Sequence, residues 1–242
     1  MGPLLERVDN LSVNCGARRP PVLFRYKCCP NPSAAARALR ASLRFSCNFV
    51  PMYSKALTTA IQHMTDLSDA DNALFSAVTS SRRLKKGEIV LREGTVCRDL
   101  YFVEEGYLRT YYNKEDGNVV NLNFTFEGEF TSNLKSAISR EPSTMSIEAG
   151  EDTLLWIFDL DKLSPEMKSH PPVSQFIRRT TMQMLLASEA RGNLLKIYTP
   201  AERYHYIERN KPHVLQRVSL SHLASFLGVS RETLSRIRSR KV

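Results

Sequence analysis

The sequence LSHLASFLGVSRETLSRIRS, residues 220–239, decides what fold is expected at the C-terminal end of the chain. Ala224 is small where two short crossed helices would touch. Gly228 lies at the turn between them, where a positive φ costs glycine little. Apolar side chains from both segments would form the shared core: Leu223, Leu227, Val229, Leu234 and Ile237. The stretch therefore predicts a helix-turn-helix.

The second of these helices is expected to have a buried side and a polar side, at about 100° per residue. Leu234 and Ile237 define the buried side. The opposite side holds Glu232, Ser235, Arg236, Ser239 and Arg240, with Arg231 at its margin. Arginine can pair with guanine and glutamate can accept from cytosine, and each good pair contributes about 1–3 kcal/mol of discrimination. The polar side therefore favours double-stranded DNA as the partner, against the simpler alternative of a solvated basic helix.

Residues flanking the polar side add candidate phosphate contacts. Ser230 is a suitable N-cap and would leave the helix N-terminus pointing at a phosphate. The other candidates for phosphate contacts are Gln216, Arg217, Ser219 and His222.

The run SRETLSR, residues 230–236, resembles the recognition helix of the cyclic-AMP receptor protein and fumarate-nitrate regulator (Crp/Fnr) family. It contains the Arg-Glu-x-x-x-Arg pattern of one branch and the Glu-x-x-Ser-Arg pattern of the other. The resemblance implies that Arg231, Glu232 and Arg236 read bases, with Ser235 beside them. It also implies an α+β fold: an N-terminal β-roll, a long central dimerisation helix and a C-terminal helix-turn-helix.

The upstream sequence fits this architecture from about Met52 onward. Short β-rich runs separated by glycine or charged turns are expected as strands within residues 86–94, 100–106, 107–113, 118–126, 144–149 and 153–158. Several short strands at close spacing indicate a sandwich or barrel. We therefore expect a β-roll at 52–165, a central helix at 166–198 and a helix-turn-helix domain at 199–242.

The central segment 173–197 lacks proline, and its apolar residues recur at helical spacing. Thr180, Gln183, Ser188 and Arg191 interrupt the heptad, so a monomeric helix packed on the roll is also allowed. A homodimer is preferred, because a two-fold protein places its recognition helices about 34 Å apart. A further helix is expected to begin at Thr199-Pro200 and to end near Asn210, and any wing must come from residues 211–218 or be absent.

The family's cyclic-nucleotide site uses a Gly-Glu pair for the ribose and a later arginine for the phosphate. Gly128 and Glu129 match the pair, but Ser143 and Thr144 stand where the resemblance places the arginine and its neighbour. A phosphate held without that arginine loses a charge-assisted bidentate bond. The roll is therefore expected to have lost or exchanged its ligand, with Arg140 as a minority substitute for the arginine. No cofactor is expected.

Residues 1–51 differ in composition from the rest of the chain. Eight Lys or Arg against Glu6 and Asp9 give this leader a net charge of +6 out of the total of +9, so the basic balance is mostly a property of the leader. Half of the twelve prolines lie there too. We expect it to be disordered or an upstream translated region that ends before a true start at Met52; an organelle transit peptide is the alternative.

Four of the five cysteines lie in this leader: Cys15, Cys28, Cys29 and Cys47. Their spacing does not suit an iron-sulfur cluster shared with Cys97, because cluster ligands must converge on one small core. No metal site is expected. Free thiols and the lack of a long apolar run favour a cytoplasmic location, with no membrane span.

Other classes of protein fit the sequence less well. The five histidines are scattered and no glycine-rich phosphate loop follows a strand, so no enzyme activity is expected. A cyclic-nucleotide or small-molecule binding module that does not recognise DNA is the alternative, although it leaves the polar face of the last helix unexplained. An activator would also contact RNA polymerase, for which no sequence signature is seen. The effector is not identified by the sequence.

Overall fold

The structure of the chain is a computed structural model that describes residues 53–239, all of them within one compact unit, Asn48–Val242. The predictions made for the leader, for Met52 and for Arg240 lie outside the described residues. Within residues 53–239, no helix combines the length and apolar character needed to cross a membrane.

Two capped helices precede the first strand, and the sequence analysis did not foresee them. Helix α1 (Lys55–Gln62) begins after Ser54, whose hydroxyl accepts from the N–H of Leu57. Helix α2 (Asp69–Val78) begins with a capping box formed by Ser68 and Asp71. Such caps satisfy N–H groups that a helix leaves without a partner in its first turn.

Within the part of the chain that the structure describes, eight strands form two antiparallel sheets of four strands each. One sheet has the order β1-β8-β3-β6, with β1 at Thr79–Leu84, β3 at Asp99–Glu105, β6 at Phe130–Thr131 and β8 at Thr153–Asp159. The other has the order β2-β7-β4-β5, with β2 at Ile89–Leu91, β4 at Leu108–Asn113, β5 at Val119–Thr125 and β7 at Ser146–Ala149. The α+β fold with a β-roll predicted from the sequence is confirmed.

Two strands were absent from the expectation. Strand β1, with the sequence TSSRRL, lies at an edge of its sheet and is buried only at Leu84. It therefore lacks the alternating apolar pattern by which a strand is found. Strand β6 has two residues, which is too short to give a periodic signal.

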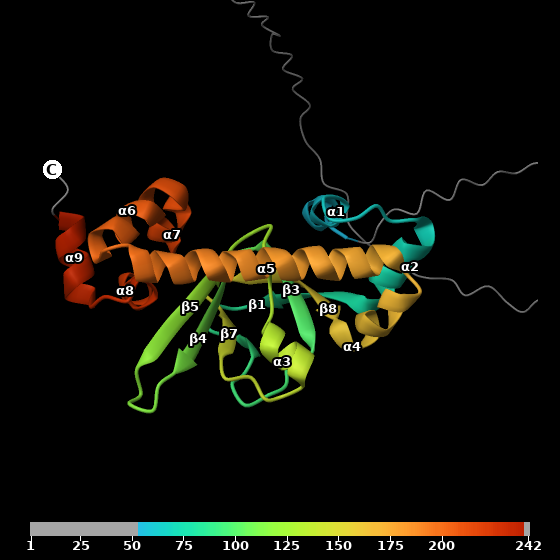
Figure 1. The fold of residues 1–242 in the computed structure, drawn as a ribbon, viewed down its shortest axis with the longest axis horizontal. Helices are drawn as coiled ribbons and strands as arrows, with labels where there is room; N and C mark the ends of the chain where they lie inside the picture. The colour runs from blue at the N-terminus through green and yellow to red at the C-terminus, as the bar shows by residue number, and fades with distance from the viewer. Residues whose placement is uncertain (1–52, 240–242) are drawn as a thin grey trace, which may run out of the picture. The chain divides into compact units, whose positions relative to one another are not determined.

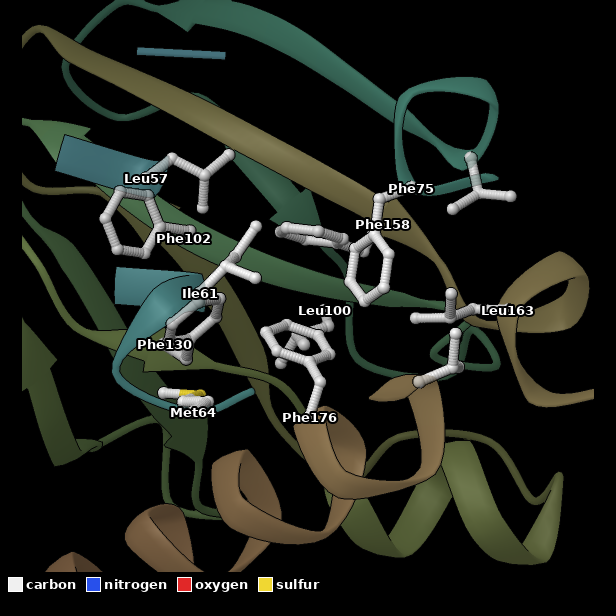
Figure 2. Packing of buried hydrophobic residues seen from close by; sticks show 12 residues of the cluster. Leu57, Ile61, Met64, Phe75, Leu100, Phe102, Phe130, Phe158, Leu163 and Phe176 are labelled. Carbon is white, nitrogen blue, oxygen red and sulfur yellow. The ribbon is translucent and has the colours of Figure 1, made fainter. Parts of the chain in front are cut away.

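The core between the sheets and the helices is aromatic. Phe75 of α2, Phe158 of β8 and Phe176 of the long helix are fully buried and meet at ring-centroid distances of 5.1–6.3 Å (Figure 2). Phe102 and Phe130 extend the cluster toward α1. This packing joins the first half of the long helix to the roll.

Further helices follow the middle of the roll and its last strand. Helix α3 (Leu134–Ser139) is an insertion between β6 and β7, and α4 (Leu160–Leu163) and η1 (Ser164–Lys168) follow β8. Helix α5 (Pro171–Ile197) is then continuous over 27 residues, as the expectation of a helix at 173–197 required (Figure 1). Its first proline occupies a helix N-terminal position where no N–H is needed.

Four short helices end the described chain: α6 (Pro200–Asn210), α7 (Pro212–Arg217), α8 (Leu220–Leu227) and α9 (Arg231–Ser239). Thr199 forms the expected capping box of α6 with Glu202. Residues 211–218, the segment to which any wing was expected to be confined, contain α7 instead, because Pro212 starts a helix well and Val214 is buried in the core of these helices. Up to Ser239 no strand follows β8.

The turn between α8 and α9 has the geometry that its sequence demands. Gly228 ends α8 with φ +68°, in the left-handed region that glycine occupies without strain. Leu223, Ala224 and Leu227 of α8 are buried in one cluster with Leu234 of α9. The two helices therefore pack as the residues of this stretch predicted.

Candidate nucleic-acid interface and adjoining cavity

Helix α9 presents its polar side chains to solvent. Leu234 is fully buried and Ile237 partly buried, so the helix is fixed by the side predicted to be apolar. The residues of α9 predicted to contact DNA, and Ser230 directly before it, are all exposed where the structure describes them: Ser230, Arg231, Glu232, Ser235, Arg236 and Ser239. Ser230 is the N-cap, and the other five residues lie together on one nine-residue helix.

Hydrogen bonds at the start of α9 favour the charged form of the Glu232 carboxyl. Ser230 accepts from the N–H of Thr233 over 3.1 Å, as an N-cap does. Hydrogen bonds from the backbone N–H of Glu232 itself and from Ser230 lower the pKa of the Glu232 carboxyl. Glu232 is therefore an acceptor near neutral pH, beside the donors Arg231 and Arg236.

Helix α8, by contrast, packs on the roll. The N–H of Asn121 in β5 donates to Ser225 Oγ over 3.0 Å, and Asn121 Nδ2 donates to the carbonyl of His222 over 3.2 Å. The rings of Phe124 and Phe226 lie 5.1 Å apart. Burial, and secondarily the nearby charge of Arg109, lower the pKa of His222. In this arrangement His222 lies against the roll, although the sequence suggested it as a phosphate contact.

Arg217, another suggested phosphate contact, is engaged by two carboxylates of the roll. Its Nη1 and Nη2 donate to Glu127 over 2.8 and 2.7 Å, and Nη2 also contacts Glu151. These bonds, those to Glu127 foremost, raise the pKa of Arg217, and the same pairing lowers the pKa of Glu127. The guanidinium also lies 5.0 Å from the ring centre of Phe126. Arg217 thus joins α7 to the roll.

A second arginine ties the end of α5 to the helices that carry α9. Arg203 of α6 donates to the carbonyl of Leu195 in α5 over 2.7 Å and to the carbonyl of Leu227 in α8 over 2.8 Å. The last carbonyls of a helix have no N–H partner within the helix, and here the guanidinium of Arg203 donates to them. The position of the α8–α9 turn is therefore set by the end of α5.

A cavity of about 700 Å³ lies where the roll, α5 and the α6–α7 junction adjoin. Gly128 and Glu129, the Gly-Glu pair of the sequence, both line it. Polar residues that interrupt the heptad of α5 line it as well: Gln183, Ser188 and Arg191. These three residues break the apolar pattern of α5 because they face the cavity and not an apolar core.

The other predicted effector residues do not line the cavity. Ser143 is 2% exposed, and its hydroxyl bonds Asn133 over 2.7 Å and the carbonyl of Met145 over 2.6 Å. Thr144 is exposed. Arg140 ends α3 with φ +62° and pairs with Asp161 at the surface. Of the five predicted effector residues, only Gly128 and Glu129 therefore line the cavity, and Arg140 pairs with Asp161 and does not take the place of the missing arginine.

Residues of the cavity wall that sequence reasoning missed include Thr110 of β4, Lys211 between α6 and α7, and Arg191 as a site residue. The polar interruptions of the helix were the signal for Arg191. Thr110 and Lys211 gave no signal, because only the packing of separate elements brings them to one wall. Across residues 53–239, no cluster of three or more His, Cys, Asp or Glu side chains is arranged to hold a metal ion, and Cys97 is buried as a free thiol.

Comparisons with known proteins agree with this geometry. Residues 81–170 match the family model described as the cyclic nucleotide-binding domain. A protein from Eubacterium rectale ATCC 33656, assigned as a transcriptional regulator of the Crp/Fnr family, is similar in structure with a TM-score of 0.58 and 23% identity, covering 71% of this chain and 82% of that one.

Two further solved structures are similar over comparable lengths. FixK2 from Bradyrhizobium japonicum has a TM-score of 0.57 and 21% identity, covering 67% of this chain and 84% of its own. CLP from Xanthomonas campestris, described as a c-di-GMP responsive global regulator, has a TM-score of 0.57 and 20% identity, covering 69% and 88%. A comparison with curated protein sequences finds no match. The chain therefore contains a cyclic nucleotide-binding type of domain and has the fold of Crp/Fnr regulators.

Proposed function

We propose that this chain, which has the fold of the Crp/Fnr transcriptional regulators, is a sequence-specific DNA-binding regulator that acts in the cytoplasm as a homodimer. The proposal assigns it no catalytic activity. Double-stranded DNA is the partner, and the bases are read by α9, with Arg231, Glu232 and Arg236 as readers and Ser235 beside them. Ser230, Ser239 and Arg240 complete the proposed contact set.

One observation carries the proposal: α9 is supported from one side only. Its apolar residues are used in packing against α8 and α6, while the side with two arginines and a glutamate has no protein against it in the described part of the chain. A helix of this kind, held at the end of a small helical domain, can enter the major groove and offer donors and acceptors to base edges. A binding module without DNA recognition gives this surface no use.

The exposed middle of α5 supports the homodimer. Met182, Leu185 and Leu186 are 51–56% exposed, and nearly every residue from 182 to 190 faces solvent. Apolar residues at spacings of three and four form one stripe along a helix. A second copy packed along this stripe would bury it in a coiled-coil manner, which leaves both α9 helices free.

Selection of bound oligonucleotides from a random pool tests the proposal. The full chain should recover a near-palindromic sequence whose half-sites lie about one DNA turn apart. Mobility shifts at two salt concentrations should show binding to this sequence that persists at the higher salt, while binding to unrelated DNA is lost. Enrichment of no sequence, or a shift that falls equally on all DNA, would favour the binding module instead.

Ligand control through the roll is part of the proposal. The domain match and the cavity beside α5 support a small-molecule effector, with Gly128 and Glu129 at its wall. Ser143 stands where the family has its arginine, and its hydroxyl is already engaged in hydrogen bonds within the protein. Micromolar binding of a cyclic phosphate is therefore not expected. Contact with RNA polymerase would follow if the regulator activates transcription.

A further inference from the structure

The cavity beside α5 has an electropositive wall. Its charged lining residues within the described chain are three cations, Lys135, Arg191 and Lys211, and one carboxylate, Glu129. Lys211 Nζ lies 3.8 Å from Glu129, so the carboxylate is already shared with one of the cations. The volume of about 700 Å³ is within the range of small-molecule sites. A wall of this charge favours an anionic occupant.

Lys135 pairs with Glu141 and Lys211 with Glu129, so within residues 53–239 Arg191 is the cation of this wall without a counter-charge. Its Nη2 donates to the carbonyls of Asn121 over 2.9 Å and Phe226 over 3.3 Å. Its Nη1 is buried and has no partner among residues 53–239. Burial lowers the pKa of Arg191 to about 10. Because a buried charge without a counter-ion is costly, this guanidinium would be stabilised by an anion in the cavity.

Thr110 supplies a second unsatisfied group to the same cavity from the roll. It is 6% exposed, and its Oγ1 is buried without a hydrogen-bond partner in the part of the chain described. Buried hydroxyls are usually bonded, and leaving one without a partner costs about 1–3 kcal/mol. One wall of the cavity thus has an unpaired cation on α5, and another has an unpaired hydroxyl on β4.

Gly192 leaves room beside Arg191. A Cβ built at this position would meet no atom within 4 Å, although glycine within a helix costs about 0.5–1 kcal/mol relative to alanine. Gly192 lines the cavity too. A larger side chain here would therefore enter the cavity without forcing the backbone to move.

We propose that this cavity binds a small organic anion, whose carboxylate or phosphate accepts hydrogen bonds from Nη1 of Arg191 while a second polar group pairs with Thr110. Lys211 lies at the same cavity and supplies further positive charge. The anion-binding group is thus on α5, in a different part of the fold from Ser143. The inference that the anion regulates DNA binding rests on the proposed function, whereas the inference that the cavity binds an anion does not.

The geometry also indicates how the anion would act on the rest of the chain. Nη1 of Arg191 would donate to the anion. Nη2 of the same guanidinium donates to the carbonyls of Asn121 in β5 and Phe226 in α8. An anion that fixes the plane of the guanidinium would strengthen both bonds. The occupied cavity would therefore stabilise the contact between the roll and α8.

Thermal unfolding of the full chain with simple anions tests the binding. Inorganic phosphate and citrate are the probes, and potassium chloride at equal ionic strength is the control. A probe at ten times its dissociation constant should raise the Tm by about 3–6 °C. Arg191→Gln should abolish the rise, and so should Gly192→Leu, which fills the cavity and keeps the arginine. Arg236→Ala, altered only on α9, should retain it.

The two probes distinguish carboxylate from phosphate as the preferred group. Equal stabilisation of the wild type, Arg191→Gln and Gly192→Leu would overturn the proposal, as would no rise beyond that given by potassium chloride. Gly192→Leu guards against misfolding of the Arg191 variant, because it removes no hydrogen bond. Failure of this test leaves the DNA-binding proposal standing, since DNA binding is not the readout.

Discussion

Arg217 of α7 and Glu127 of the roll form a bidentate ion pair, in which Nη1 and Nη2 of the guanidinium donate to the two carboxylate oxygens over 2.8 and 2.7 Å. The two residues are 90 positions apart in the sequence. Glu127 also accepts from the N–H of Gly106 over 2.9 Å, which holds the carboxylate in place. The pair therefore fixes the helices that carry α9 against the β-roll.

Loss of this pair should weaken the attachment of the C-terminal helices. A double-mutant cycle of Arg217→Ala and Glu127→Gln should give a coupling energy of about 1 kcal/mol, because the geometry is bidentate but both side chains are partly exposed. The measurement is urea unfolding at low and high salt, with the coupling smaller at high salt. Arg92→Ala, which removes an exposed arginine of the roll, is the control. A coupling energy of zero would mean that the two residues only lie close together.

The arginines of α9 should differ in what they contribute to DNA binding. Arg231→Ala and Arg236→Ala should each cost about 1–3 kcal/mol of binding and relax specificity at one base pair per half-site. Arg238→Ala is the matched control, since it removes the same charge from a flank of the same exposed helix. The control should weaken all sequences alike. The measurement is the affinity of each variant for operators changed at single base pairs. If all three substitutions weaken binding to every sequence equally, Arg231 and Arg236 contact only phosphates.

The apolar stripe of α5 should control association. Leu186→Asp places a charge on a residue that is 56% exposed in one copy, and a second copy packed there would bury it. The variant should be a monomer by light scattering at concentrations where the wild type is a dimer. Ile138→Asp, at an aliphatic residue of α3 that is 77% exposed, should remain a dimer. An unchanged mass for Leu186→Asp would remove the support that α5 gives to the dimer.

Cyclic AMP should not bind with micromolar affinity. Ser143 is buried and its hydroxyl is already bonded on both sides, so nothing at this position offers a bidentate donor to the phosphate. Arg191 does not supply one either, because Nη2 is engaged and only Nη1 is unpaired among the described residues. Titration calorimetry of the full chain should record no binding heat at micromolar concentrations. Micromolar binding that disappears in Glu129→Ala would contradict this and would show that the roll binds the cyclic nucleotide of its family.

Acid should weaken the contact between α8 and the roll. Burial is the main reason that the pKa of His222 lies below 6.5, and Arg109 and Lys86 lower it further while Glu148 opposes them. The unfolded chain then binds a proton on His222 that the folded chain does not, so this contribution to stability is complete above pH 6.5 and is lost as the pH falls below it. Unfolding of His222→Gln should lose part of the pH dependence between pH 5 and 7, an interval of about two units around the ordinary histidine value. Identical pH profiles for the wild type and His222→Gln would show that His222 does not titrate there.

Local sequence determined the parts of this protein whose signals lie within a few residues. Gly228 between two apolar segments specified a turn, and Ser230 with Leu234 and Ile237 specified which side of α9 is polar. Thr199-Pro200 specified the start of α6. Caps, turns and helical periodicity depend on neighbours in the chain, so they can be recognised without knowing the tertiary structure.

Only the tertiary structure decided what those elements are attached to. Arg217 and His222 have side chains suited to phosphate, yet they lie against the roll because β5 and its following loop supply Asn121 and Glu127 at the right distances. Arg191 appeared in the sequence as an interruption of a heptad and became part of a cavity wall once Thr110 and Lys211 were brought beside it. Contacts between residues 70 to 100 positions apart arise from packing, and no local pattern encodes them.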